Sequence, residues 1–175
     1  MVMGTASTMA CMTEALGMML PGGAAIPAVA SDRLRHAEAA GTRAVAMAAE
    51  GLTPDKILTP EAFSNAFRIL LAIGGSTNGL VHMTAVAGRC GIKVDMEALD
   101  RMGQETPVLV DLKPSGQHYM EDLEKAGGLT TVMRELRSLL NLDCLTITGR
   151  TLGENLDAAP APWAPASIAT PKPRP

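Results

Sequence analysis

The order of apolar and polar residues along the chain predicts a series of helices. Residues 6–20 are apolar on nearly every side, which is typical of a buried helix, and the turn at 21–23 (PGG) ends it. A second helix is expected from a cap at Ser31 and Asp32 to Glu50, with Gly51 as its stop. The first part of the chain is therefore expected to be helical.

Local start signals predict the next helices. The chain twice places threonine, proline and an acidic residue in succession, at 53–55 and at 59–61. Threonine as N-cap, proline at the first helical position and an acid beside the positive end of the helix dipole all favour a helix start. The second signal opens a helix over residues 62–73. After a break at 74–78, another helix is expected to run to about Arg89.

The rest of the chain mixes helices with two segments of strand character. Asp95 is expected to cap a short helix, and the apolar residues between 129 and 140 follow a helical stripe. Residues 107–112 and 144–148 predict strands. This mixture favours an α/β fold, a layered α/β/α domain that is helix-rich and incomplete, because too few strands are present to close a sheet.

The sequence divides into residues 1–156, a partial domain, and a Pro/Ala-rich tail at 157–175. Six of the twelve prolines lie between Pro160 and Pro175, so the tail is expected to be disordered or polyproline-like. A polyproline ligand for an SH3-like partner and an accidental or truncated terminus are the two interpretations of this segment.

Composition narrows the possible partners and the compartment. The chain is 47% hydrophobic and 19% charged, with a net charge of −3, which indicates neither nucleic acid nor an anionic membrane as a partner. No signal peptide or membrane-spanning stretch is apparent. The three cysteines, Cys11, Cys90 and Cys144, form no Cys-x-x-Cys pair. They are interpreted as buried or semi-buried thiols in a reducing cytosol.

Candidate chemistry lies where glycine and hydroxyl residues precede an apolar helix. Residues 4–8 (GTAST) and 74–78 (GGSTN) both follow this pattern. Free N–H groups at a helix start, next to glycine, can bind an anion. Ordinary N-capping by serine, threonine or asparagine explains the same residues without a ligand. Neither segment is a Walker loop or a Gly-x-Gly-x-x-Gly dinucleotide motif.

From residue 1 to about 156 the sequence closely resembles the family of dihydroxy-acid and phosphogluconate dehydratases, which includes sugar-acid dehydratases. The likeness is carried by residues 3–9 (MGTASTM), 14–17 (EALG), 20–22 (LPG), 58–63 (LTPEAF), 74–78 (GGSTN), 112–116 (LKPSG), 126–128 (AGG) and 148–153 (TGRTLG), together with His82. Residues 107–116 are somewhat more similar to the sugar-acid branch.

The resemblance implies a cytoplasmic hydro-lyase that uses an iron–sulfur cluster and Mg²⁺ to dehydrate a 2,3-dihydroxy acid to a 2-keto acid, in branched-chain amino acid biosynthesis or sugar acid metabolism. A cluster iron would act as Lewis acid on the departing 3-hydroxyl group while a base removes a proton beside the carboxylate. The small-molecule dihydroxy acid is the expected partner, and the intact enzyme is expected to be a homo-oligomer.

The resemblance also implies that this chain has only part of the site. The family's three cluster cysteines do not match Cys11, Cys90 or Cys144, and the magnesium ligands and the serine base fall outside the sequence. The chain is expected to be the second half of the N-terminal domain, started at an internal methionine. It should lack activity and bind no cofactor alone, so no catalytic or metal-binding residue is assigned to it.

The implied site residues come from the two glycine-led segments. Thr5, Ser7 and Thr8 are expected near the cofactor. The substrate is assigned to Ser76, Thr77, Asn78 and His82, although His82 could equally serve local packing. The two helix starts are expected to lie side by side at the opening of one binding site. A small-anion-binding module and a non-catalytic interaction subunit that completes a dehydratase supplied by another chain are the alternative functions.

Overall fold

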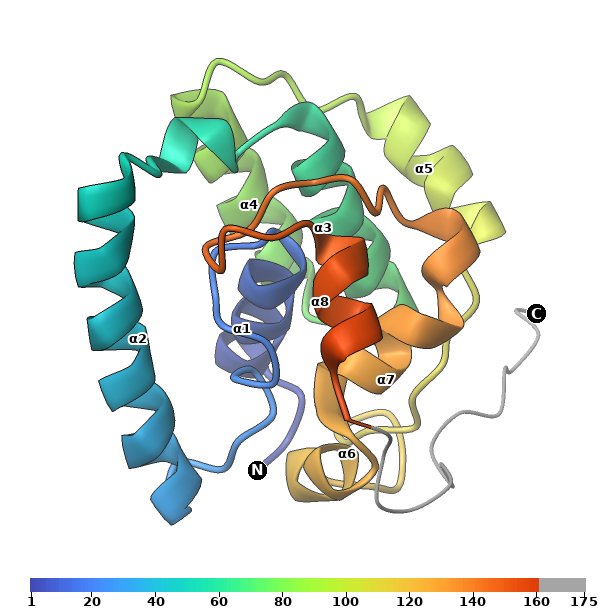
Figure 1. The fold of residues 1–175 in the computed structure, drawn as a ribbon. Coiled ribbons are helices and arrows are strands. Elements are labelled where there is room, and N and C mark those ends of the chain that lie inside the picture. The colour runs from blue at the N-terminus through green and yellow to red at the C-terminus, as the bar shows by residue number, and fades with distance from the viewer. Residues whose placement is uncertain (161–175) are drawn as a thin grey trace.

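The computed structural model describes residues 1–160, and the fold within them is dominated by helices (Figure 1). Their order and bounds are α1 (Thr5–Ala15), α2 (Ser31–Glu50), η1 (Pro54–Lys56), α3 (Pro60–Ala72), α4 (Thr77–Arg89), α5 (Met96–Glu105), α6 (Met120–Lys125), α7 (Gly128–Glu135), η2 (Arg137–Leu139) and α8 (Leu152–Ala158), where η marks a single 3₁₀ turn. The helix-rich part of the sequence prediction is confirmed.

Local capping residues set several of these helices, as their sequence signals predict. The Thr59 hydroxyl accepts a hydrogen bond from Ala62 N–H at the start of α3, with Pro60 as the first helical residue. The Asp95 carboxylate accepts from Glu97 N–H at 2.9 Å and caps α5. At the end of α2, Gly51 takes a left-handed conformation with φ of 65°. Such conformations suit glycine because it has no Cβ atom.

Helix α1 ends earlier than its apolar sequence predicts, at Ala15 instead of residue 20. Gly17 has φ of 84°, and a Cβ atom there would lie 3.0 Å from the Leu145 carbonyl oxygen. The Gly17 carbonyl in turn accepts from Ile147 N–H at 2.8 Å. The chain therefore leaves the helix where residues 145–147, distant in sequence, pack against it.

Helix α1 lies at the centre of the core, between two groups of buried side chains (Figure 1). Cys11 and Ala15 pack with residues of α6, α7 and α8. Met12 and Leu16 pack with residues of α3 and α4, including Phe63. Helix α2 stands to one side in Figure 1, and none of its residues is buried.

Polar side chains, instead of apolar burial, join α2 to the core. The Arg33 guanidinium donates to the carbonyls of Gly23 and Ile26, and the Arg43 guanidinium donates to the Ile147 carbonyl at 2.5 Å. Arg43 also pairs with Glu50 on the same helix. The inner face of α2 is thus fixed by two arginines.

The two predicted strands do not form in the described part of the chain, so that prediction is wrong and the layered α/β/α arrangement is not confirmed. Residues 107–112 and 144–148 contain only isolated bridge residues: Val108, Leu112, which pairs with His118, and Leu145, which pairs with Thr151. Leu109 N–H donates to the Ala72 carbonyl at the end of α3. A strand needs a neighbouring strand for its hydrogen bonds, and residues 1–160 provide none.

Two further expectations concern the last part of the sequence. The apolar stripe at 129–140 forms α7 and the short turn η2. Of the predicted tail, Asp157 and Ala158 complete α8, while residues 161–175 lie outside the described residues. Among the helices of residues 1–160, none is both long and apolar enough to cross a membrane.

Candidate functional site

Helix α1 begins at a glycine and has hydroxyl side chains in its first turn. Gly4 is the N-cap residue in an extended conformation, with φ of −99° and ψ of −170°, and no side chain caps the helix. The preceding segment is held because Met3 N–H donates to the Lys113 carbonyl at 2.7 Å. The first turn contains no acidic residue, so the positive end of the dipole is not neutralised from within the helix.

Helix α4 begins in a similar way. Gly74, with φ of 56°, turns the chain from α3 toward α4. Ser76 is the N-cap residue, and its hydroxyl accepts from Asn78 N–H at 3.3 Å. The first turn of α4 also lacks an acidic residue. Both helix starts therefore offer positive potential and neutral hydrogen-bonding groups.

The two helix starts lie side by side, which confirms the juxtaposition predicted from the sequence. The hydroxyl oxygens of Thr5 and Ser76 are 3.0 Å apart, and the Asn78 amide donates to Thr5 Oγ1 at 3.2 Å. The Thr8 hydroxyl, which is fully buried, accepts from Ser76 N–H at 3.0 Å. Four side chains from segments about seventy residues apart thus form one hydrogen-bonded cluster.

Two glycines allow this close approach. A Cβ atom on Gly75 would lie 2.7 Å from Thr8 Cγ2, and one on Gly79 would lie 2.9 Å from the same atom. Real Cβ atoms do not approach carbon so closely without displacement of one partner. Gly75 of the GGSTN segment and Gly79 directly after it therefore serve the contact between α1 and α4, while Gly74 makes the turn.

The other predicted site residues lie near this cluster in the sequence but outside its hydrogen bonds. Ser7 is buried, and its hydroxyl donates to the Val2 carbonyl at 3.1 Å. Thr77 and His82 are exposed on α4. The structure therefore brings together Thr5, Thr8, Ser76 and Asn78, whereas Ser7 holds the chain that precedes α1.

A basic residue adjoins the start of α1. The carbonyl of Lys113 accepts from Met3 N–H, and its ammonium donates to the Tyr119 hydroxyl at 2.8 Å. The same ammonium lies 4.1 Å from the centre of the Tyr119 ring, a cation–π geometry. The LKPSG segment was recognised in the sequence only as a family motif, because its contact with residues 1–3 depends on the tertiary fold.

A buried carboxylate, Glu14, was not identified as a functional or structural residue from the sequence. It is 3% exposed, and it accepts hydrogen bonds from Gly22 N–H at 2.9 Å and Ala24 N–H at 2.8 Å. Burial raises the pKa of Glu14 to about 7, while the two backbone hydrogen bonds act in the opposite direction. The available signal was an acid within the otherwise apolar run at 6–20. Glu14 fixes the loop that follows α1.

The described residues do not suit an iron–sulfur cluster, which thiolates usually hold. Cys11 is fully buried, and burial together with the charge of Glu14 raises its pKa to about 12. Burial also raises the pKa of Cys144, which packs beside a different part of the core, while Cys90 is exposed. No group of three histidine, cysteine or acidic side chains suited to a metal ion occurs within residues 1–160. The neutral cluster at the helix starts can bind an anion or orient a polar ligand.

Known proteins match the chain throughout its described length. The family model for "Dihydroxy-acid/6-phosphogluconate dehydratase N-terminal" matches residues 1–155. A dihydroxy-acid dehydratase of Methanococcoides burtonii is 48% identical over 155 residues, which cover 89% of this chain and 28% of that protein. That of Caldanaerobacter subterraneus subsp. tengcongensis is 48% identical over 159 residues, 90% of this chain and 29% of that protein.

A third relative has a similar identity and a similar coverage. The dihydroxy-acid dehydratase of Ignicoccus hospitalis is 46% identical over 158 residues, which cover 89% of this chain and 29% of that protein. The chain thus spans less than a third of the length of these relatives. With the family model matching nearly all of the described residues, the chain belongs to the dihydroxy-acid/6-phosphogluconate dehydratase family, in its N-terminal region.

Proposed function

We propose that this chain supplies part of the active site of a hydro-lyase that dehydrates a 2,3-dihydroxy acid, either a dihydroxy acid of amino-acid synthesis or a sugar acid, to a 2-keto acid. The observation that carries the proposal is the pairing of the α1 and α4 starts through Thr5, Thr8, Ser76 and Asn78. The names of the relatives support the reaction class.

The proposed roles of these residues are binding and orientation. An anionic carboxylate is stabilised by the N–H groups and positive dipole at a helix start, and Thr5, Ser76 and Asn78 add neutral hydrogen-bonding groups. Unactivated hydroxyl and amide groups are poorly suited to remove a proton from carbon. Thr77 and His82 remain candidates for substrate contact because they continue the exposed side of α4 from the same helix start.

The cofactor side is assigned to Thr5, Ser7 and Thr8. An iron–sulfur cluster with Mg²⁺ would supply Lewis-acid assistance to the departing hydroxyl group and stabilise charge on the substrate. In this chain, Ser7 would hold the segment that precedes α1 through its hydrogen bond to Val2. Thr8 would fix the distance between the two helix starts. Ligands for the cluster and for Mg²⁺ would come from outside this chain, in an intact, cytoplasmic and homo-oligomeric enzyme.

An activity measurement tests the proposal that the chain alone is inactive. The purified chain is incubated anaerobically with iron, sulfide and Mg²⁺, and then with 2,3-dihydroxy-3-methylbutanoate or a five-carbon sugar acid. We expect a colourless protein and no 2-keto acid, because Cys11, Cys90 and Cys144 form no metal-binding group within residues 1–160. Turnover, or a stable cluster that disappears in Cys11→Ser, would contradict this assignment.

A binding measurement tests the helix starts themselves. In an amide NMR titration, the dihydroxy acid should shift the signals of Thr5, Ser76 and Asn78, and Asn78→Ala should weaken the effect. Thr84→Val is the matched control on α4, because the Thr84 hydroxyl has no hydrogen-bond partner within the described residues. Equal responses to acetate and phosphate would favour a general anion-binding module instead of a dehydratase site.

A further inference from the structure

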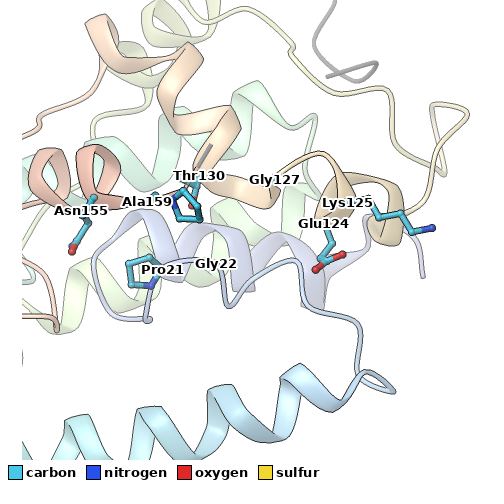
Figure 2. A pocket seen from close by; sticks show the side chains of 10 residues that line it. Pro21, Gly22, Glu124, Lys125, Gly127, Thr130, Asn155 and Ala159 are labelled. Atoms are coloured by element: carbon cyan, nitrogen blue, oxygen red, sulfur yellow. The ribbon is translucent and has the colours of Figure 1, made fainter. Parts of the chain in front are cut away.

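A cavity of about 660 Å³, shown in Figure 2, shares no lining residue with the paired helix starts. The loop after α1 forms one side of this cavity through Pro21 and Gly22. The end of α6 and the start of α7 form a second side, and the end of α8 forms the third. No role in the proposed dehydration is assigned to this cavity.

The start of α7 has no side-chain cap, and Gly127 and Thr130 from this start line the cavity. Gly127 and Gly128 both have left-handed φ values, of 99° and 65°, and no side chain accepts a hydrogen bond from the first turn of the helix. Loop carbonyls of the described chain likewise accept no hydrogen bond from the N–H groups of Gly128, Leu129 or Thr130. All three residues are buried. Buried N–H groups are normally paired, so this turn is suited to a ligand that accepts hydrogen bonds.

The side chain of Thr130 is a second, independent indication of a ligand. Thr130 is 8% exposed and lines this cavity as well as a small one beneath it. Its hydroxyl makes no hydrogen bond within residues 1–160, whereas the adjacent Thr131 hydroxyl donates to the Ala126 carbonyl at 3.0 Å. The Thr130 oxygen is not among the fully buried side-chain atoms without a partner in the described residues, so it opens to the cavity. The Thr130 hydroxyl is therefore available to a molecule in the cavity.

The remaining wall of the cavity limits the chemistry of such a molecule. Pro21, Ala158, Ala159 and Pro160 present apolar groups. The Arg134 guanidinium holds the end of α8 in place by donating to carbonyls of residues 156, 159 and 160. A ligand in the cavity would thus meet the start of α7, these apolar groups and the Asn155 amide, which is already bonded to Thr146 and Thr148.

Charge around the cavity favours a monoanion over a dianion. Glu124 adds a negative charge to the lining, and Figure 2 shows the Lys125 side chain directed away from Thr130. One helix start provides only about half a unit of positive charge. We propose that this cavity binds a short aliphatic monocarboxylate, whose carboxylate accepts from the α7 N–H groups and the Thr130 hydroxyl while its alkyl group packs on the proline and alanine wall.

An NMR titration of the full chain tests this site with isobutyrate as the probe. The amide signals of Gly128, Leu129 and Thr130 should shift in a saturable manner. Neutral isobutyramide, which has the same alkyl group, should bind at least about tenfold more weakly, because hydrogen bonds to a charged acceptor are the stronger ones. This comparison requires no substitution, so it does not depend on how a variant folds.

A matched pair of variants tests the hydroxyl. Thr130→Val keeps the shape of the side chain and should weaken isobutyrate binding by about fivefold to tenfold. Thr84→Val removes another hydroxyl without a partner, outside the cavity, and should leave binding unchanged. Equal binding of isobutyramide, unsaturable shifts, or an unchanged affinity in Thr130→Val would overturn the proposal. Tighter binding of inorganic phosphate than of isobutyrate would overturn the assignment to a monocarboxylate.

Discussion

The buried carboxyl group of Glu14 should make the chain less stable as the pH rises from 4.5 toward 7. Its two oxygens accept hydrogen bonds from Gly22 N–H and Ala24 N–H, and the side chain is 3% exposed. Removal from water disfavours the ionised form, whereas the two N–H groups favour it. Burial is the larger effect, so the pKa of Glu14 rises from 4.5 to about 7.

The sign and the size of the effect follow from proton linkage. Between pH 4.5 and 7 the folded chain binds more protons at Glu14 than the unfolded chain does, so the free energy of unfolding decreases as the pH rises. The stabilising contribution is complete below pH 4.5 and is lost by about pH 7. A pKa change from 4.5 to about 7, at about 1.4 kcal/mol per unit, corresponds to about 3 kcal/mol.

Urea unfolding of wild type and Glu14→Gln at about pH 5 and about pH 8, followed by circular dichroism, measures this contribution. Glutamine stays neutral at both pH values, but its NH₂ group cannot accept from a backbone N–H, which costs about 1–3 kcal/mol at the lower pH. The stability advantage of wild type over the variant should therefore shrink by about 3 kcal/mol between the two pH values.

Taking the difference between wild type and variant removes the other titrating groups. His36 is one of them: burial and the nearby Arg33 lower its pKa, so its contribution increases with pH, opposite to that of Glu14. Glu38→Gln on the exposed face of α2 controls for the loss of one carboxylate elsewhere. A difference that stays constant with pH would show that the two N–H groups balance burial, and one that grows with pH would show that they outweigh it; either would refute the reasoning.

Three further substitutions test packing at the candidate site and elsewhere in the fold. Gly75→Ala places a Cβ atom 2.7 Å from Thr8 Cγ2 and should lower the free energy of unfolding by about 1–3 kcal/mol in urea. Gly41 lies in the exposed middle of α2, and a Cβ atom there would have no atom within 4 Å. Gly41→Ala should therefore raise the free energy of unfolding by about 0.5–1 kcal/mol. A change of the same sign in Gly75→Ala and Gly41→Ala would contradict the steric argument. Asn65 is 1% exposed and accepts from Asn141 N–H at 2.8 Å, so Asn65→Ala should lower the thermal midpoint and cost about 2–3 kcal/mol. An unchanged midpoint would show that the chain around Asn141 is held by other contacts.

The pairing of α1 and α4 could be predicted because both segments carry the same local signal, glycine followed by hydroxyl or amide residues before an apolar helix. The sequence did not determine which hydroxyl group would perform which task. Ser7 and Thr8 are neighbours, yet Ser7 bonds to Val2 whereas Thr8 bonds to Ser76. That difference depends on how the two helices approach each other, which the small size of Gly75 and Gly79 permits.

Local chemistry in the sequence determined where most helices begin, because a cap acts within a single turn: Thr59 before Pro60 and Asp95 before α5 need no distant partner. Strand character at 107–112 and 144–148 was not sufficient, since a strand is completed only by hydrogen bonds to another strand, and none lies beside these segments in residues 1–160. Contacts beyond neighbouring residues likewise decided three other features. These are the end of α1 at Ala15, the hydrogen bonds from Gly22 and Ala24 to the Glu14 carboxylate, and the uncapped start of α7. Such contacts arise only when helices pack around α1, because they depend on burial and close approach and not on the order of neighbouring residues.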